Sequence, residues 1–320
     1  MKVPKIKLKN LLLDLQENWP LARETNFGLG GPARYFFRAT SKADLLKALS
    51  VAKQLKIKTF VLGSGTNVAI SDRGFSGLVI KFENQNPHQS FYLNKRLLIA
   101  EASVLLADLL KFSFKHDLAG LEKMAGIPGT LGGAIVGNAG AYGQMISDQV
   151  IWVEIFDGQK IRQVSKSTLK FNYRDSLFKQ RPTWLVLRVA FKLLAGERKI
   201  LQAESRKIIA IRNNKYPAGI KSAGSFFKNL PVTKIPNSVR KKIPTEKIKA
   251  GKIPAAYLLE QSNVGGMTVR GMAVSHFHHN FLINTGTGTY CDLRLLVRHL
   301  KKKVYRQFGL ELEEEVRYIN

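Results

Sequence analysis

The chain has a single cysteine, few acidic residues and no long apolar run. Cys291 is the one cysteine among 320 residues, so no internal disulfide can form, and we interpret it as a small half-buried residue at a helix start. No CxxC, HExxH or Cys/His cluster is present, and we expect no metal. The apolar run of residues 11–13 is too short for a signal peptide, and no eighteen apolar residues follow one another. We therefore expect a cytoplasmic protein without integral membrane association, and residues 7–19 as a short amphipathic helix packed on its body.

Positive charge is in large excess. The sequence contains 51 Lys and Arg against 23 Asp and Glu, for a net charge of +28. Such a charge favours anionic partners such as nucleic acid, acidic lipid or a phosphate-bearing substrate, although its scatter over many segments also fits a general lysine bias. There is no zinc spacing, RNP-like aromatic motif or helix-turn-helix signature. A nucleic-acid-binding function would rest on charge alone, and we expect no nucleic-acid partner.

Apolar residues make up 45% of the sequence, enough for the cores of two domains. We expect an α+β chain with a first domain over residues 1–195 and a second over residues 196–320. The boundary is placed where composition changes, since residues 196–252 contain fifteen Lys or Arg, three Glu and no Asp. Periodicity and turn signals predict helices over residues 41–55, 104–115, 255–261 and 292–308, and strands over residues 59–62, 68–71, 77–82, 150–157, 160–164, 185–193 and 310–318.

Glycine is concentrated in residues 126–143, which contain seven glycines, one proline and no charged residue. Glycine is used where the backbone takes unusual dihedral angles or comes very close to another group. Two interpretations stay open for this glycine-rich segment. It either wraps its main chain against a large ligand, with N–H groups as donors, or forms tight turns in a sheet.

A second glycine motif, Gly63-Ser-Gly-Thr-Asn67, follows a predicted strand. It lacks the third glycine of the dinucleotide-binding pattern, and a strand follows it where that pattern has a helix. We interpret it as a strand–turn–strand loop that meets an anion with its N–H groups and polar side chains, with a plain tight turn as the alternative. A ligand with both a diphosphate and a large flat ring would use both glycine segments.

Three polar positions are candidates for chemistry, each with a structural alternative. Arg174 lies in a short polar segment, where a surface arginine before a turn is the alternative. Ser225 follows small residues and precedes two phenylalanines, which a capped helix start or a Ser/Thr turn would also explain. The one acidic run is near the C-terminus, where strand alternation would put Glu311, Glu313 and Glu315 on one face.

Taken together and in this order, these segments resemble the UDP-N-acetylenolpyruvoylglucosamine reductase family. The resemblance runs from about residue 23 to the C-terminus, and it is to the subgroup without an extra tyrosine loop, since little lies between Ser176 and residue 185. The chain departs from the family in Leu230, which replaces a proline, and in a longer basic segment at residues 232–252, hereafter the basic insert. The matching segments are residues 26–33, 61–67, 120–133, 138–143, 173–176, 223–229 and 312–319.

The resemblance implies a fold and a reaction. The fold is a two-lobed FAD-binding unit of the vanillyl-alcohol-oxidase (PCMH) type, followed by a smaller α+β substrate-binding domain whose C-terminal strand returns to the active site. The reaction is the NADPH-dependent reduction of UDP-N-acetylglucosamine enolpyruvate to UDP-N-acetylmuramate through non-covalent FAD, in peptidoglycan precursor synthesis. We expect a monomer. The alternatives are another FAD-dependent oxidoreductase of the same fold and a basic nucleic-acid-binding protein.

The resemblance also implies roles for single residues. Hydride addition places negative charge on the substrate, which Arg174 would stabilise, and the resulting carbanion needs a proton, for which Ser225 matches the family's donor. Glu315 matches the family's catalytic acidic residue, and Lys228 is a candidate helper of Ser225. The expected substrate contacts are Tyr173, Lys215, Lys228, Asn229 and Asn280. The expected FAD contacts are Gly63, Ser64, Gly65, Thr66, Asn67, Gly126, Ile127, Pro128, Gly129, Thr130, Gly133, Asn138, Gly140, Ala141 and Tyr142.

Overall fold

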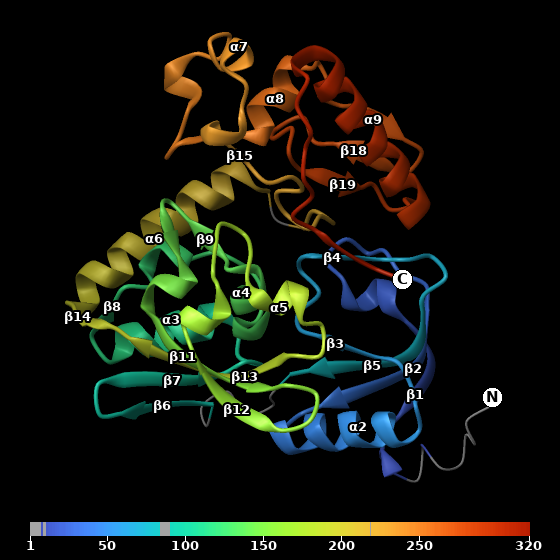
Figure 1. The fold of residues 1–320 in the computed structure, drawn as a ribbon, viewed down its shortest axis with the longest axis vertical. Helices are drawn as coiled ribbons and strands as arrows, with labels where there is room; N and C mark the ends of the chain where they lie inside the picture. The colour runs from blue at the N-terminus through green and yellow to red at the C-terminus, as the bar shows by residue number, and fades with distance from the viewer. Residues whose placement is uncertain (1–7, 9–10, 84–89, 218) are drawn as a thin grey trace. The chain divides into compact units, whose positions relative to one another are not determined.

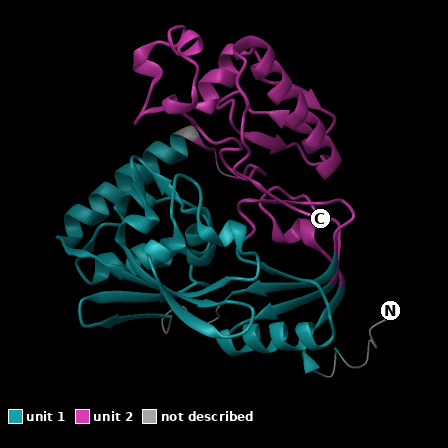
Figure 2. Cartoon of the chain, in the orientation of Figure 1, with its two compact units in different colours: residues 1–17, 35–64, 76–214 teal, residues 18–34, 65–75, 215–320 magenta. Residues whose placement is uncertain are grey.

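The computed structural model describes residues 8, 11–83, 90–217 and 219–320, which form two compact units (Figure 2). Unit 1 comprises residues 1–17, 35–64 and 76–214, and unit 2 comprises residues 18–34, 65–75 and 215–320. The chain therefore passes between the units several times. The expected domain division at residue 195 stays a prediction, but the compact units do not follow it. The helix after residue 195 belongs to unit 1, because its Leu201 and Ile208 are buried in the core of that unit.

Figure 1 shows the order of the helices and strands along the chain. The helices are α2 (Lys42–Gln54), α3 (Leu106–Lys115), α4 (Leu131–Gly137), α5 (Leu177–Gln180), α6 (Arg198–Lys215), α7 (Asn237–Arg240), α8 (Ala255–Gln261) and α9 (Tyr290–Phe308). The longer strands are β1 (Gln16–Pro20), β2 (Pro32–Ala39), β3 (Thr59–Leu62), β5 (Phe75–Phe82), β6 (Phe91–Asn94), β7 (Leu97–Glu101), β11 (Val150–Phe156), β12 (Ile161–Ser165) and β13 (Leu185–Lys192). The shorter strands are β4 (Val68–Ile70), β8 (Leu118–Ala119), β9 (Gly140–Ala141), β10 (Gln144–Met145), β14 (Leu194–Ala195), β15 (Leu230–Pro231), β16 (Lys252–Ile253), β17 (Thr268–Val269), β18 (Met272–Val274), β19 (Leu282–Asn284) and β20 (Arg317–Ile319).

A sheet in the order β1-β2-β5-β3 has most of its residues in unit 1, with α2 between β2 and β3 along the chain. Residues 18–20 of β1 and 32–34 of β2 belong to unit 2. The sequence specifies the start of α2, where Ser41 Oγ accepts the hydrogen bond of Asp44 N at 3.1 Å. Leu45, Leu49 and Ala52 recur at helical spacing and are buried. The helix expected over residues 41–55 is confirmed, as are the strands expected over residues 59–62 and 77–82.

The second part of unit 1 is an antiparallel sheet in the order β12-β11-β13-β7-β6. The Asp157-Gly158 turn joins β11 to β12, and Asp157 Oδ1 accepts the N–H groups of Gln159 and Lys160. Helix α4 packs on β13 and β7, and α3 packs on α4. Side chains of both sheets and of these helices belong to one hydrophobic core, so unit 1 is two sheets around a shared interior.

Unit 2 is built from short strands and the helices α7, α8 and α9. Strands β17, β18 and β19 form an antiparallel sheet, and α8 and α9 share a core with it. Helix α9 begins with a capping box between Thr289 and Asp292, which the sequence analysis did not identify. Asp72, in the loop after β4, adds two further bonds, because its carboxylate accepts Tyr290 N at 2.8 Å and Cys291 N at 3.0 Å.

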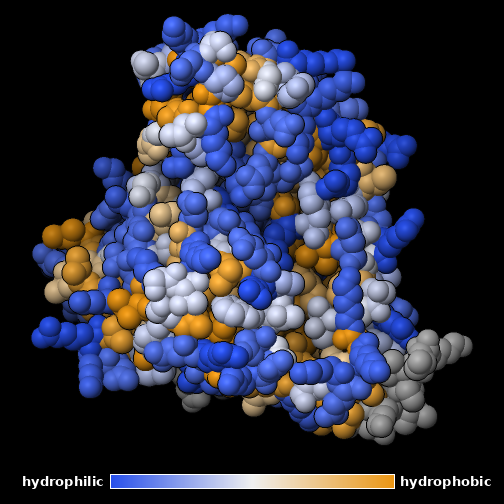
Figure 3. Space-filling model, viewed as in Figure 1, coloured by the Kyte–Doolittle hydropathy of each residue, from blue (hydrophilic) through white to orange (hydrophobic). Residues whose placement is uncertain are grey.

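The basic insert is closed at its base by β15 and β16, where Leu230 pairs with Ile253 and Pro231 with Lys252. Ile235 and Ile243 are buried in the core of unit 2 and anchor the insert. Its cationic side chains face solvent, and Figure 3 shows hydrophilic surface over much of this side of the molecule, the region of α7 included. The exposed cations of the insert are Lys234, Arg240, Lys241, Lys242, Lys247 and Lys249.

Several expectations about elements were wrong. Cys291 is exposed, because the helix start that it occupies faces solvent. The strand expected over residues 310–318 is only β20, because the preceding residues pair through isolated bridges such as Phe227–Glu314. The helix expected over residues 7–19 falls partly outside the described residues, and from Gln16 on the chain forms β1. In the part of the chain that the structure describes, no helix has the length and hydropathy of a membrane span.

Candidate active site

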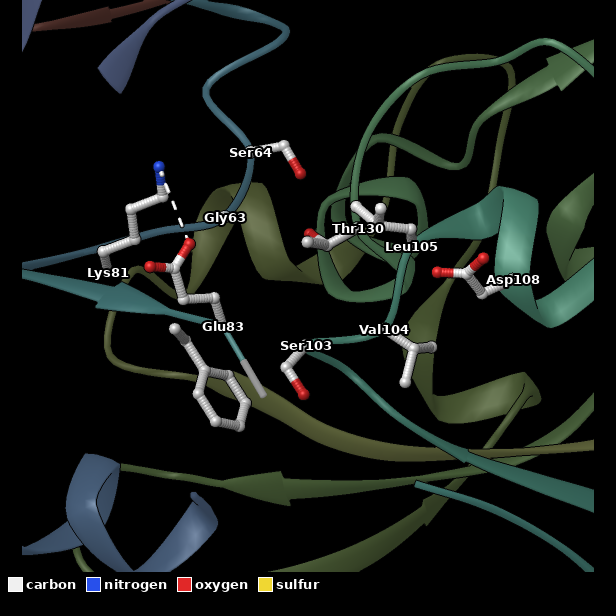
Figure 4. Close-up of a pocket in the computed structure, with 10 residues that line it drawn as sticks. Gly63, Ser64, Lys81, Glu83, Ser103, Val104, Leu105, Asp108 and Thr130 are labelled. Atoms are coloured by element: carbon white, nitrogen blue, oxygen red, sulfur yellow. Dashed lines mark ion pairs between the residues drawn. The ribbon is translucent and has the colours of Figure 1, made fainter. Parts of the chain in front are cut away.

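Unit 1 contains a pocket of about 310 Å³ between the loop after β3, the end of β5 and the starts of α3 and α4. Figure 4 shows Lys81 and Glu83 on one side of it and Asp108 of α3 on the other. Lys81 Nζ and Glu83 Oε2 form an ion pair at 3.8 Å. The lining residues are Gly63, Ser64, Lys81, Phe82, Glu83, Ser103, Val104, Leu105, Asp108 and Thr130. This mixture of hydroxyl, charged and apolar groups suits a ligand that has both polar and apolar parts.

Two residues expected to bind the cofactor, Gly63 and Thr130, lie against each other in this pocket. A side chain on Gly63 would collide with Thr130 Oγ1, so the close approach requires glycine. Thr130 is the N-cap of α4, where its Oγ1 accepts Gly133 N at 3.4 Å. Ser103 Oγ is buried and has no hydrogen-bond partner among the described residues. A buried hydroxyl of this kind in a pocket wall is a position where a polar ligand atom fits.

The second half of the Gly63–Asn67 loop belongs to unit 2. Gly65 has φ +66°, and a side chain there would collide with Glu24 O, so this glycine is needed for packing within the protein. Asn67 Nδ2 donates to Glu315 O at 3.3 Å, and Asn67 O accepts Arg317 N at 3.2 Å. Asn67 therefore joins the end of the loop to the C-terminal segment that contains Glu315. Thr66 lies in the same turn.

The glycine-rich segment contains a helix, which neither of its two interpretations foresaw. Residues 126–130, with Ile127, Pro128 and Gly129, form the loop that leads into α4. Asn138 ends α4 in the left-handed region at φ 44° and is fully buried. Its Nδ2 donates to Asn172 O at 2.8 Å, and its Oδ1 accepts Ser147 N at 3.4 Å. The Asn138 side chain thus ties the end of α4 to the turn that precedes Arg174.

Arg174 is held in a strained turn of unit 1. Its φ is 53°, in the left-handed region that side chains other than glycine rarely adopt, and such strain clusters at functional sites. Its Nη2 donates to Gly140 O at 2.7 Å, and its guanidinium lies 5.5 Å from the centre of the Tyr173 ring. Arg174, Tyr173 and Gly140 are therefore brought together, as an active site would require.

The β9–β10 hairpin presents the last of the expected FAD contacts in unit 1. Ala141 pairs with Gln144, and Tyr142 occupies the turn between the strands at φ 52°. The Tyr142 side chain is 48% exposed. An exposed ring on a tight hairpin is available to a ligand or a solvent-facing surface.

In unit 2, Ser225 and Glu315 lie on adjacent extended segments. Ser225 forms a bridge with Phe281, and the carbonyl of the next residue, Phe226, accepts Glu315 N at 2.8 Å. Two residues further on, Lys228 N donates to Glu313 O at 2.8 Å. Residues 225–228 thus lie between residues 280–281 on one side and residues 313–315 on the other. Ser225, the expected proton donor, and Glu315, the expected catalytic acidic residue, thus lie on neighbouring segments.

The expected substrate contacts of unit 2 have protein partners of their own. Lys228 Nζ forms an ion pair with Glu313, and Asn229 Oδ1 accepts Ala255 N at 3.2 Å at the start of α8. Asn280 is buried, and both polar groups of its side chain bond to the main chain of Phe227. Lys215 ends α6, and its side chain lies outside the described part of the structure. These roles as substrate contacts stay predictions.

A tyrosine next to this site is kept neutral. Burial, with the Glu314 carboxylate as the next cause, raises the pKa of the Tyr318 hydroxyl above its ordinary value. The Arg294 guanidinium lies 4.1 Å from the centre of the Tyr318 ring. The Tyr318 hydroxyl therefore keeps its proton at alkaline pH values where an exposed tyrosine would begin to ionise.

Sequence reasoning missed three residues that support the site. Ser103 lines the pocket, Asp72 holds the start of α9, and Arg212 of α6 donates from Nε to Gly126 O at 3.0 Å. Asp72 and Arg212 act through contacts that are distant in sequence, whereas Ser103 is distinguished by its burial in the pocket wall. No local motif marks any of the three. For Arg212 the one available signal was the helical spacing of Leu201, Ser205, Ile208 and Arg212.

Comparison with known proteins connects both units to one family. Residues 33–160 match the family model "FAD binding domain", and residues 215–319 match "UDP-N-acetylenolpyruvoylglucosamine reductase, C-terminal domain". The UDP-N-acetylenolpyruvoylglucosamine reductase of Solibacter usitatus is 38% identical over 307 residues, which cover 96% of this chain and 97% of that protein. The enzyme of the same name from Caldanaerobacter subterraneus subsp. tengcongensis is 34% identical, with coverage of 98% and 97%.

A solved structure has the same fold. The crystal structure of UDP-N-acetylenolpyruvylglucosamine reductase (MurB) from Thermus caldophilus matches with a TM-score of 0.74 at 25% sequence identity. The match covers 96% of this chain and 98% of that one. The expected α+β fold, an FAD-binding domain followed by a second domain, is confirmed.

Proposed function

The chain belongs to the UDP-N-acetylenolpyruvoylglucosamine reductase family, and from this membership we propose how its residues divide the work of the reaction. It is an FAD-dependent oxidoreductase that reduces UDP-N-acetylglucosamine enolpyruvate to UDP-N-acetylmuramate, with NADPH as co-substrate, in peptidoglycan synthesis. The single observation that carries this conclusion is 38% identity to a reductase of this family over 96% of the chain.

The residues of unit 1 fit FAD. The pocket presents the Ser64 and Thr130 hydroxyls, a Ser103 Oγ that has no hydrogen-bond partner in the described part of the chain, and a glycine that admits close approach of the main chain. We assign Gly63, Ser64 and the residues 126–130 loop to the cofactor. When bound, FAD supplies hydride transfer from NADPH to the substrate. The glycine segments contain no His or Cys that could form a covalent flavin link, so acid precipitation should release the flavin into the supernatant.

Arg174 is assigned to the stabilisation of negative charge on the substrate. Its guanidinium is fixed by the bond to Gly140 O and by the Tyr173 ring, so little reorganisation is needed when charge develops. A planar guanidinium can also bind a carboxylate with two parallel hydrogen bonds, which an ammonium group cannot. The enolpyruvyl carboxylate is the group of the substrate that such a fork would bind.

Ser225 is assigned to protonation of the carbon that becomes nucleophilic after hydride addition. A serine hydroxyl is a weak acid, so it needs neighbours that stabilise its transient alkoxide. Glu315 lies on a segment bonded to residues 225–228, and Lys228 belongs to that stretch itself, which supports this assignment. Asn229 and Lys215 are assigned to substrate binding.

We further propose that the protein acts as a monomer in the cytoplasm, where NADPH and nucleotide sugars are available.

One anaerobic experiment tests the function. Protein whose flavin has been reduced with NADPH is mixed with UDP-N-acetylglucosamine enolpyruvate, and flavin absorbance is followed. We expect stoichiometric reoxidation with formation of UDP-N-acetylmuramate, detected by mass spectrometry. Flavin that stays reduced with this substrate but is reoxidised by another acceptor would contradict the proposed substrate while leaving an FAD-dependent oxidoreductase.

A further inference from the structure

The side chain of Asn280 completes a main-chain hydrogen-bond pattern beside Ser225. Phe226 N donates to Asn280 O at 2.8 Å. Phe227 N then donates to Asn280 Oδ1 at 2.8 Å, and Asn280 Nδ2 donates to Phe227 O at 2.8 Å. The amide side chain therefore bonds Phe227 as a peptide group of a neighbouring strand would. Three bonds from one residue fix the backbone immediately after Ser225.

Burial makes this arrangement costly to disturb. Asn280 is 2% exposed, and Phe226 and Phe227 are also buried. Loss of the amide would leave the N–H and C=O of Phe227 without water or another partner on that side, and each such group costs about 1–3 kcal/mol. On the opposite side, Phe226 O and Lys228 N are already bonded to the segment that contains Glu315. The chain at residues 225–228 is thus held from both sides.

We infer that Asn280 is a positioning residue, which acts on the reaction through the Phe227 main chain and sets the place of the Ser225 hydroxyl. The inference rests on the proposed function, in which Ser225 protonates carbon. The bonds to Phe227 use one of the two N–H donors and one of the two acceptor lone pairs of the Asn280 amide. The side chain is 2% exposed, so its main engagement is with the protein backbone. A proton donor must be held closely, since a 1 Å misplacement can cost ~10²-fold in rate.

The decisive variant is Asn280→Asp. A protonated carboxyl has the shape of the amide, accepts from Phe227 N and donates to Phe227 O. An ionised carboxylate repels Phe227 O, and burial raises the pKa of the introduced carboxyl toward neutral pH. We expect reoxidation of the reduced flavin by substrate to be ~10²-fold slower than wild type at pH 9 and to recover as pH falls to 6. Reduction of the flavin by NADPH should be unchanged.

The pH dependence of reoxidation is also measured for the wild type, because other titratable and charged groups lie near position 280 and contribute to the profile of both proteins. These are His278 and His279 on the same segment, and Lys228, Glu313, Glu314 and Glu315 on the two segments packed against it. A neutral variant, Asn280→Gln, tests the same point without a buried charge. It displaces the amide by one methylene, so reoxidation should slow by ~10-fold or more, with the pH profile of the wild type.

Asn284→Asp is the matched control. Asn284 is also buried in unit 2, its Nδ2 donates to Phe27 O at 3.0 Å, and its Oδ1 accepts Gly286 N and Gly288 N at 2.9 Å. The chemical change and the burial match those at position 280, but the partners lie on other segments. We expect this variant to lose stability and to reoxidise its flavin within about threefold of the wild-type rate.

Hydrogen exchange of the peptide over residues 223–229 supplies a readout without substrate. Asn280→Asp should raise its exchange at pH 9 and not at pH 6, and Asn284→Asp should leave it unchanged. Equal slowing of reoxidation in both Asp variants, a rise in KM without loss of kcat, or unchanged exchange would each overturn the inference. Failure of the proposed function is distinct, because the wild-type protein itself would then not be reoxidised by the substrate.

Discussion

Many candidate site residues are held by main-chain atoms. Asn138 bonds Asn172 O, Arg174 bonds Gly140 O, Asn67 bonds Glu315 O, and Asn280 bonds both the N–H and the C=O of Phe227. A carbonyl oxygen has a fixed position and no alternative rotamer, so such contacts fix side-chain geometry at little entropic cost. Conservative substitutions that change the shape of the bonded group should therefore be poorly tolerated.

Replacement of Ser225 by alanine should separate the two halves of the reaction. NADPH should still reduce the flavin, because Ser225 is assigned only to protonation of the substrate carbon. Turnover should fall by ~10²–10⁴-fold, the usual contribution of general acid catalysis. Stopped-flow absorbance measures both steps. Ser262→Ala, which removes a buried hydroxyl bonded to Leu258 O in the same unit, is the control. Wild-type turnover in Ser225→Ala would reduce Ser225 to a structural residue.

Replacement of Arg174 by lysine should lower kcat at every salt concentration. An ammonium group cannot make the bond to Gly140 O and still offer a two-pronged contact to a carboxylate. Steady-state kinetics at low and high ionic strength measure the effect. Arg198→Lys is the matched control, because Arg198 also bonds main-chain carbonyls, those of Phe114 and Lys115, in unit 1. Similar kcat values for the two variants would contradict the role of Arg174.

At the scale of elements, α9 depends on a residue from a distant part of the chain. Asp72 follows β4, and its carboxylate accepts hydrogen bonds from the first two N–H groups of α9. Its negative charge also interacts favourably with the positive end of the helix dipole. The capping box of Thr289 and Asp292 satisfies other groups at the same end. The start of α9 is thus fixed partly by local sequence and partly by tertiary structure.

Asp72→Ala should destabilise unit 2 by about 1–2 kcal/mol, since loss of one side-chain cap typically costs ~1 kcal/mol and Asp72 bonds two N–H groups. Differential scanning calorimetry should show a midpoint lower by several degrees. Glu246→Ala removes the same charge from an exposed position of the same unit and should shift the midpoint by less than one degree. An equal shift in the two variants would assign the effect to net charge.

The helices and strands that were predicted correctly are specified by neighbouring residues in the sequence. The elements that were missed or misplaced depend on tertiary contacts or have a weak apolar pattern. Helix α2 has its cap and apolar spacing in sequence, and β11, β12 and β13 have alternation with turn residues between them. Helix α6 was missed because most of its surface, Ile200 and Ile211 included, is exposed and its apolar spacing is weak. The strand expected over residues 310–318 was shortened because those residues pair with residues 227–228 through isolated bonds that only tertiary contact creates.

The candidate site shows the same limit. Arg174, Ser225 and Glu315 were identified by resemblance of their surrounding motifs, and the structure adds their contacts. The main-chain role of Asn280 could not be read from sequence, because its partner Phe227 is 53 residues away. Ser103 could likewise not be predicted from the sequence, because only the structure shows that its hydroxyl is buried in the wall of a pocket.

At the scale of the whole molecule, the net charge of +28 requires an explanation distinct from the catalytic role assigned to the single charge of Arg174. The cations of the basic insert are exposed on a loop whose apolar residues anchor it to unit 2. Exposed charge of this kind can steer an anionic nucleotide sugar toward the protein without contacting it in the transition state. Steering is screened by salt, with a Debye length of ~10 Å at 0.1 M ionic strength.

Neutralisation of Arg240, Lys241 and Lys242 to glutamine should therefore lower kcat/KM at low ionic strength and leave kcat unchanged. The difference from wild type should vanish near 0.5 M salt, where screening is nearly complete. Steady-state kinetics across a salt series measure both constants. The exposed cations Lys302, Lys303 and Arg306 of α9 offer a second triple variant with the same change in net charge. A kcat loss confined to the insert variant would place the insert in the active site.

The pairing of β4 with β20 cannot form until residues 317–319 have been synthesised. Asn67 and Glu315 are bonded to each other across 248 residues of sequence, and β4 lies parallel to the last strand. At ~5–20 residues per second, a ribosome takes roughly 12–50 s to make that intervening stretch. During this time Val68, Ala69 and Ile70, all buried in the finished protein, have no β20 to pair with. An apolar strand edge left open for tens of seconds invites mispairing with other chains, so this segment is where a chaperone would be needed during synthesis.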